Sequence, residues 1–187
     1  MTNIAILASG NGTNAQRIIE YFVGSADIKV AIVISNKEDA YVRQRARTFG
    51  IKEVYVSPSD FKNPEKISRI FYQYRIDWII LAGFLQLIPP VLIKEYNKRI
   101  INIHPALLPK YGGKGMYGMH VHESVIANKD KSSGITVHFV NEVYDDGEII
   151  FQASCKIKRE DTPETLAEKI HQLEYEHYPK IIEDLIR

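Results

Sequence analysis

The sequence predicts an α/β fold: a doubly wound, mostly parallel sheet with an antiparallel C-terminal extension and a long C-terminal helix. Two observations predict it. Up to residue 103, short apolar runs rich in β-branched residues alternate with segments of helical periodicity, a pattern typical of parallel strands covered by helices on both faces. Beyond residue 130, two strand-like runs separated by a turn precede one long amphipathic segment, which predicts a hairpin and a final helix.

The first half of the chain alternates strand-like runs with helix-like segments. The predicted strands are residues 3–9, 28–35, 54–56, 78–82 and 99–103. The predicted helices are residues 14–23, 40–49, 64–74 and 89–96. Gly24 and Gly50 follow the first two helices, where glycine commonly ends a helix, and Pro64 stands in the first turn of the third.

The second half begins with a glycine-rich loop at residues 111–119. Its predicted elements are a short helix near residues 122–128 and two strands at residues 134–140 and 148–157. The turn Asp145-Asp146-Gly147 separates these strands, as in a hairpin. Asp161-Thr162-Pro163-Glu164 combines a capping residue, an early proline and an acid, which together indicate the start of the last helix.

Composition is that of an ordinary globular protein and excludes several classes. The 187 residues suit one domain, residues 1–187. Lys and Arg number 24 against 23 Asp and Glu, so the basic excess of a protein that binds nucleic acid or an anionic membrane is missing. One cysteine precludes an internal disulfide, and no apolar run approaches the ~20 residues of a membrane helix. We expect a cytoplasmic monomer or homodimer that binds small molecules, not nucleic acid or membrane.

Residues 9–15, with the sequence SGNGTNA, lie between the first predicted strand and the first helix. Glycines allow positive φ there, so that backbone N–H groups converge on an anion at the helix start. The segment also matches the dinucleotide pattern G-x-G-x-x-A, yet Ser35-Asn36-Lys37 stands where NAD-binding proteins carry an acid. Lys37 leaves an NADP site open, and a purely structural turn is a third alternative. We favour a phosphate-binding loop.

Asn102 and His104 end a predicted buried strand, and strand alternation points both side chains to the same face. A lone histidine in such a place is commonly structural. Here the adjacent amide, the carboxyl edge of the sheet and the proline-containing loop that follows favour catalysis. Asn102 could donate to a developing oxyanion, and His104 could act as acid or base near neutral pH.

Four segments in order resemble one protein family. They are NIAILASGNGTN at 3–14, LAGFLQLI at 81–88, INIHPALLPKY at 101–111 and HFVNEVYDDGEIIFQ at 138–152. Over nearly its whole length the sequence resembles the phosphoribosylglycinamide formyltransferases, a branch of the folate-dependent formyltransferase superfamily. The Asn-x-His, Leu-Leu-Pro and later Asp pattern is typical of the superfamily, and the glycine loop is typical of this branch.

The resemblance implies the formyltransferase fold and a metal-free transfer of the formyl group of 10-formyltetrahydrofolate, the co-substrate, to the amine of 5'-phosphoribosylglycinamide in purine biosynthesis. The catalytic residues it implies, which stabilise a tetrahedral intermediate, are Asn102, His104 and Asp145. The substrate-binding residues it implies are Gly12, Thr13, Asn14 and His171 at the phosphate and Glu174 at the ribose hydroxyls. The folate-binding residues it implies are Leu85, Gln86, Leu87, Ile88, Asn102, Asn141 and Asp145.

The same resemblance divides the domain into a substrate-phosphate half, about residues 1–100, and a catalytic and folate half, about residues 101–187. Two features depart from the pattern of the family. His171 stands where the family often has a lysine, and residues 112–118 form a longer loop with more glycine. Lys62 is the candidate cation for the glutamate tail of the folate. We also expect Asp145 to favour the imidazolium of His104 and so to raise its pKa.

Some alternatives stay open at this point. His120 and His122 could form a metal site with His104, although we favour no metal. His138 either contacts the site or only packs. A formyltetrahydrofolate hydrolase usually carries an extra N-terminal regulatory domain, and methionyl-tRNA formyltransferase an added C-terminal RNA-binding domain and a basic surface. An NADP-binding module would use the glycine loop but would have no use for Asn102 and Asp145.

Overall fold

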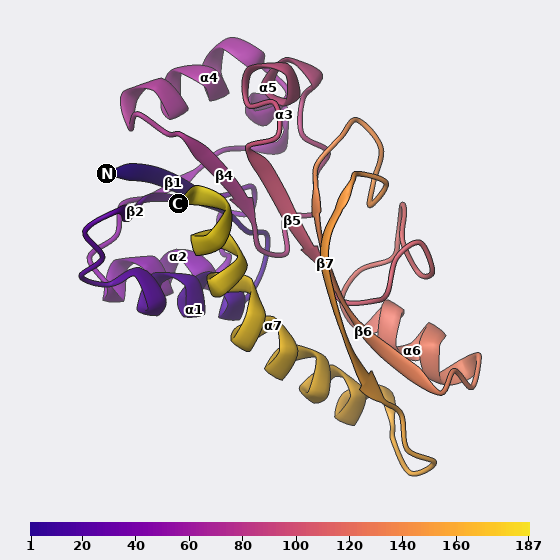
Figure 1. Cartoon of the computed structure of the whole chain (residues 1–187). Helices are drawn as coiled ribbons and strands as arrows, with labels where there is room; N and C mark the ends of the chain where they lie inside the picture. Colours follow the sequence, from indigo (N-terminus) through magenta and orange to yellow (C-terminus); the bar gives the residue numbers. More distant parts are fainter.

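A seven-stranded sheet runs through the molecule, with helices on both faces (Figure 1). The computed structural model describes residues 1–187. The strand order is β3-β2-β1-β4-β5-β6-β7. The strands are β1 (Thr2–Leu7), β2 (Ile28–Ser35), β3 (Glu53–Tyr55), β4 (Trp78–Leu81), β5 (Ile100–His104), β6 (Ser132–Phe139) and β7 (Ile149–Lys156). β1 to β5 pair in parallel, and β6 and β7 are antiparallel, so the predicted fold class is confirmed.

Seven helices accompany the sheet. They are α1 (Thr13–Phe22), α2 (Tyr41–Thr48), α3 (Pro58–Phe61), α4 (Pro64–Gln73), α5 (Pro90–Glu95), α6 (Met119–Ala127) and α7 (Pro163–Ile186). Every element predicted from the sequence is present, with its ends displaced by at most three residues. Only α3 was not predicted, because a single turn has no periodicity to detect. Its signals are local: Pro58 begins it, and the Ser57 side chain accepts a hydrogen bond from the N–H of Asp60.

The sheet separates two apolar clusters, as strand alternation requires. Ile4 and Ile6 of β1 belong to the first cluster, which packs against α1, α2, α6 and α7. Ala5 and Leu7 of the same strand belong to the second cluster, which packs against α3, α4 and α5. Figure 1 shows α1, α2 and α7 on one side of the sheet and α3, α4 and α5 on the other. The two clusters therefore share little besides the strands.

Helix α7 is tied to the sheet by a buried tyrosine. The helix begins at a capping box in which the Thr162 side chain and the N3 residue Thr165 bond each other's backbone N–H. Two turns before its end, the hydroxyl of Tyr178 donates to the carbonyl oxygen of Leu81 at the end of β4, at 2.9 Å. Burial raises the pKa of Tyr178 well above 10, so the hydroxyl remains a donor. This contact fixes α7 against the strand ends, where His171 and Glu174 face the cavity described below.

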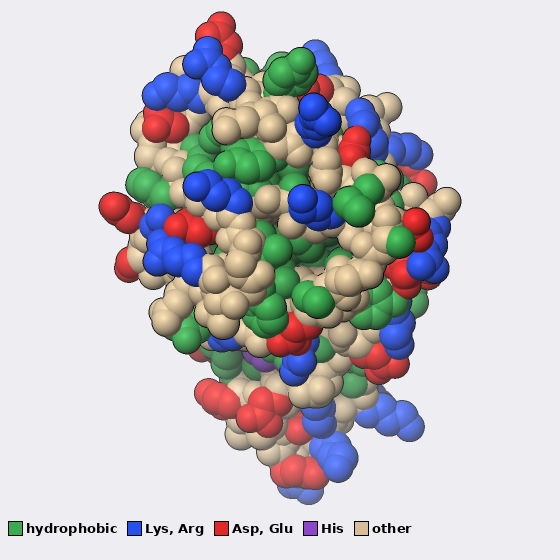
Figure 2. Space-filling model, turned by 90° about the vertical axis from the view of Figure 1, so that its left-hand side faces the viewer, with side chains coloured by type: hydrophobic (Ala, Val, Ile, Leu, Met, Phe, Trp, Pro, Cys, Tyr) green, Lys and Arg blue, Asp and Glu red, His purple; other side chains and the backbone are tan.

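Charged side chains of both signs are interspersed on the face of the molecule shown in Figure 2. That distribution agrees with the net charge of +1. No helix combines the length and the apolar character needed to cross a membrane.

Candidate functional site

A cavity of about 660 Å³ opens at the carboxyl ends of the parallel strands. All three predicted catalytic residues line it, namely Asn102, His104 and Asp145. All five predicted substrate-binding residues line it as well, namely Gly12, Thr13, Asn14, His171 and Glu174. The structure thus brings together side chains from the loop after β1, the end of β5, the β6–β7 connection and α7.

The register of β5 and β6 places Asn102 directly opposite His138. The Nδ1 of His138 lies 2.8 Å from the carbonyl oxygen of Phe139, which only accepts, so Nδ1 carries the proton. The free Nε2 then accepts from the Asn102 amide nitrogen at 3.1 Å, which fixes the direction of that amide. The same nitrogen lies 3.5 Å from Asp145 Oδ1, at the limit of a hydrogen bond. His138 therefore contacts the site, and the second N–H of Asn102 remains available to a stronger acceptor.

His104 is buried at the end of β5, and both ring nitrogens have a polar neighbour. Its Nε2 lies 2.7 Å from the carbonyl oxygen of Tyr111, and its Nδ1 lies 3.5 Å from Asp145 Oδ2. Because a carbonyl only accepts, Nε2 carries the proton in the neutral ring and the Nδ1 lone pair faces Asp145. Burial lowers the pKa of His104; Asp145 raises it, as expected, and so does the Tyr111 carbonyl, but these two effects are smaller than that of burial, so the pKa is lowered overall. In the free protein His104 is therefore a neutral base at pH 7.

Asp145 is a carboxylate at the centre of this group. Burial alone would raise its pKa, but His138, His104 and the backbone N–H of Gly113 together lower it. The N–H of Gly113 donates to Oδ2 at 2.9 Å. A fixed carboxylate beside a neutral imidazole favours the imidazolium as soon as the ring accepts a proton.

The loop before α1 has a geometry that only glycine fits. Gly12 adopts φ 76° and caps α1, and a Cβ there would lie 2.3 Å from Val42 Cγ2 and 2.9 Å from Val42 Cα. Arg45 of α2 holds the loop from outside, since its Nε and Nη2 donate to the backbone and side-chain oxygens of Asn11 at 2.9 and 2.7 Å. The first turn of α1 leaves backbone N–H groups without intrahelical partners at the cavity. This arrangement suits an anion.

Asn14 and Glu174 form a buried polar pair beside this loop. The amide nitrogen of Asn14 donates to Glu174 Oε2 at 2.9 Å. Burial raises the pKa of Glu174 to about 7, against a smaller opposing effect of Asn14. The Asn14 Oδ1 atom is buried and has no hydrogen-bond partner, which costs about 1–3 kcal/mol. A ligand that donates to both acceptors would satisfy the pair.

Two further imidazoles face the cavity. Burial lowers the pKa of His171, against a smaller effect of Glu168, so His171 is neutral at pH 7 in the free protein. His122 is 2% exposed, its Nδ1 has no partner, and burial lowers its pKa to about 4. His120, the other member of the suggested metal site, is exposed. No three His, Cys, Asp or Glu side chains are arranged to hold a metal ion.

The predicted folate-binding segment only partly reaches the cavity. Leu85 lines it, whereas Gln86, Leu87, Ile88 and Asn141 do not. The Gln86 amide instead donates to the carbonyl oxygen of Pro58, at 3.0 Å. Lys62 caps the end of α3 and does not line the cavity, whereas Lys37 and Lys114 do.

Comparison with known proteins agrees with this geometry. Residues 2–182 match the formyl transferase family. The chain belongs to this family. It is 39% identical over 185 residues to the chloroplastic phosphoribosylglycinamide formyltransferase of Arabidopsis thaliana, covering 96% of this chain but 63% of that protein. It is 38% identical over 187 residues to the phosphoribosylglycinamide formyltransferase of Haemophilus influenzae, covering 97% of this chain and 86% of that protein.

Solved structures of the formyl transferase family share the whole fold. The phosphoribosylglycinamide formyltransferase from Bacillus halodurans superimposes with a TM-score of 0.88 at 36% identity, covering 99% of this chain and 95% of that one. The chain spans less than two thirds of the length of the plant relative. The predicted membership of the family is confirmed.

Several contacts within this formyl transferase site were not predicted from the sequence. Arg45 belongs to α2 and reaches the loop only in the folded chain, 34 residues away. The Ser9 hydroxyl links strand ends, donating to Asn36 Oδ1 at 2.6 Å and accepting from the N–H of Leu85 at 2.9 Å. Met116 and Tyr144 line the cavity from loops. No sequence pattern marks these roles, because each depends on which loops meet in space.

Proposed function

We propose that the protein transfers the formyl group of 10-formyltetrahydrofolate to the amine of 5'-phosphoribosylglycinamide. The observation that carries the proposal is the joining of the Asn102, His104 and Asp145 group to the glycine loop within one cavity. Relatives named for this reaction support it. A nucleotide-binding module would have no use for an amide, an imidazole and a carboxylate around one reacting point.

The phosphate of the substrate binds at the N-terminus of α1, where backbone N–H groups of Thr13 and Asn14 meet the cavity. His171 lies beside it and takes up a proton as the dianion approaches, which supplies the charge that its neutral form lacks. Glu174 accepts hydrogen bonds from the ribose hydroxyls. These contacts place the substrate amine towards the end of β5.

The folate binds on the other side of the reacting point. Leu85 lines the cavity, and the segment from Leu85 to Ile88 presents backbone groups to the pterin ring from the edge of the cavity. The connection from Asn141 to Asp145, in which Tyr144 and Asp145 line the cavity, covers the ring. The first half of the chain thus supplies the phosphate-binding loop and the segment from Leu85 to Ile88. The second half supplies all three catalytic residues, the ribose-phosphate contacts on α7 and the connection that closes over the folate.

The reaction starts when the amine attacks the formyl carbon and a new C–N bond forms. The formyl oxygen becomes an oxyanion. The second N–H of Asn102, whose nitrogen lies 3.5 Å from Asp145 Oδ1 in the free protein, donates to this oxyanion. A preorganised donor of this kind contributes about 3–4 kcal/mol. Neutral His104 accepts the proton of the attacking amine at Nδ1, and Asp145 stabilises the imidazolium. The same proton passes to N10 of the folate as the old C–N bond breaks.

An absorbance assay tests the proposal. Purified protein, 10-formyl folate donor and glycinamide ribonucleotide should show turnover that depends on both substrates. Turnover at the same rate with water in place of the ribonucleotide would overturn the proposal in favour of a hydrolase. Absence of turnover together with saturable binding of NADPH would overturn it in favour of a nucleotide-binding module.

A further inference from the structure

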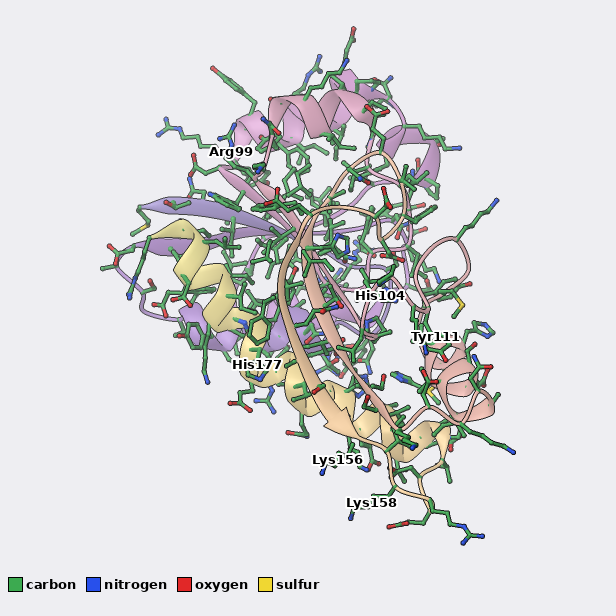
Figure 3. All side chains as sticks on the ribbon, turned by 45° about the vertical axis from the view of Figure 1, so that its right-hand side comes forward. Arg99, His104, Tyr111, Lys156, Lys158 and His177 are labelled. Carbon is green, nitrogen blue, oxygen red and sulfur yellow. The ribbon has the colours of Figure 1, made fainter.

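Tyr111 combines an unfavourable backbone conformation with a contact to the catalytic histidine. Its φ is 56°, in the left-handed region that residues with a Cβ avoid. Its carbonyl oxygen lies 2.7 Å from His104 Nε2. Figure 3 labels both residues, with Tyr111 close to α6. A backbone held in this conformation requires something to hold it.

The phenol of Tyr111 supplies that restraint. Its hydroxyl donates to Asp130 Oδ2 at 2.9 Å and accepts from the Asn128 amide at 3.0 Å. Asn128 is the C-cap of α6, and Asp130 lies two residues beyond it. Lys110 lies 3.3 Å from Asp130 and balances its charge. The ring thus anchors residue 111 to the end of α6.

The anchored carbonyl determines which nitrogen of His104 carries the proton. As long as it accepts from Nε2, the neutral ring keeps its Nδ1 lone pair towards Asp145 and the reacting point. If residue 111 relaxes out of the left-handed region, the carbonyl leaves Nε2. The proton is then free to reside on Nδ1, where the Asp145 carboxylate attracts it, and the ring can no longer accept a proton there.

We propose that Tyr111 is a positioning residue: its phenol, fixed by Asp130 and Asn128, keeps the backbone carbonyl on His104 and so sets the reactive tautomer. The catalytic consequence rests on the proposed function, but the tautomer does not. No part of the network lies in the substrate contacts described above. Tyr111 also borders a hollow of about 210 Å³, and Tyr111→Phe removes only the hydroxyl while the ring is kept.

The test compares Tyr111→Phe with the wild type and with Tyr72→Phe, whose ring is 87% exposed. Ring ¹⁵N chemical shifts of His104 report the tautomer without substrate. We expect a single Nε2–H form in the wild type and in Tyr72→Phe, and a mixture with Nδ1–H in Tyr111→Phe. Asp145, His138 and His122, which face His104 from the other elements, are unchanged in all three proteins.

Activity provides the second readout. In Tyr111→Phe, kcat should fall about tenfold while both KM values stay within twofold. The acidic limb of the pH profile should also move to lower pH, because the contact that the variant weakens, from the Tyr111 carbonyl, raises the pKa of His104. Asp130→Asn removes the charge that accepts from the phenol and should change the ¹⁵N shifts in the same direction. Unchanged ¹⁵N shifts in both variants would overturn the inference, whatever the activity. A wild type without turnover would instead count against the proposed function alone.

Discussion

Replacing Glu174 by glutamine should stabilise the free protein above neutral pH. The Glu174 side chain is 5% exposed, and burial raises its pKa from 4.5 to about 7. Between these two values the folded state binds more protons than the unfolded state, so stability decreases as pH rises and stays reduced above pH 7. At about 1.4 kcal/mol per pH unit, the interval corresponds to about 3 kcal/mol. Glutamine has nearly the same shape, accepts from Asn14 and does not ionise.

Urea unfolding at a series of pH values measures this difference. The free energy of unfolding of Glu174→Gln should exceed that of the wild type by about 1 kcal/mol at pH 5 and by about 3 kcal/mol at pH 8. In thermal unfolding the gap at pH 8 corresponds to about 6–12 °C in Tm for a chain of this length. Other ionisable groups are common to both proteins and cancel in the comparison.

Glu176→Gln is the matched control, since Glu176 lies exposed on the same helix, 3.6 Å from Lys180. Its stability should follow that of the wild type at every pH. If the curve of Glu174→Gln also runs parallel to that of the wild type from pH 5 to pH 8, Glu174 is ionised at no cost in the folded state and the account of its burial is wrong.

Three further predictions concern the reaction. Gly12→Ala adds a Cβ that collides with Val42. In steady-state assays the KM for the ribonucleotide should therefore rise at least tenfold, while the KM for the folate should not change. Equal changes in the two KM values would refute the loop assignment. Arg45→Met removes the hydrogen bond to the Asn11 carbonyl, so it should raise the KM for the ribonucleotide about tenfold and leave kcat within twofold. An unchanged KM would show that the loop keeps its conformation without Arg45. Asp145→Asn should lower the pKa of His104 further and reduce kcat at least about a hundredfold, with His104→Ala similarly slow. The double variant should be little worse than either single one, and losses that simply multiply in single-turnover rates would contradict the pairing.

Most of the fold could be predicted because its signals are local. The glycines and prolines at helix ends and the β-branched runs placed every element except one-turn α3. Strand alternation alone put Asn102 and His104 on one face, where both contact Asp145. Membership of the family followed from ordered motifs that span the chain.

The electrostatics of the site could not be predicted in the same way. The sequence places a carboxylate near His104, which argues for a raised pKa, but the desolvation that outweighs it depends on how completely the surrounding loops cover the ring. The same holds for Glu174, whose raised pKa depends on how completely this α7 residue is buried in the folded chain. The tertiary contacts of Arg45 and Tyr111 likewise leave no periodic or spacing signal.

The division of the apolar residues into two clusters has a consequence for altering this protein. The aromatic side chains of Phe61 and Phe71 lie in the cluster covered by α3, α4 and α5, and neither lines the cavity. The glycine loop, α6 and α7 belong to the opposite side of the sheet. A redesign of the α3–α5 layer for thermal stability can therefore spare the chemistry only if it keeps Phe61, because the Phe61 ring lies 4.9 Å from that of Phe84, which belongs to the same cluster and lines the cavity.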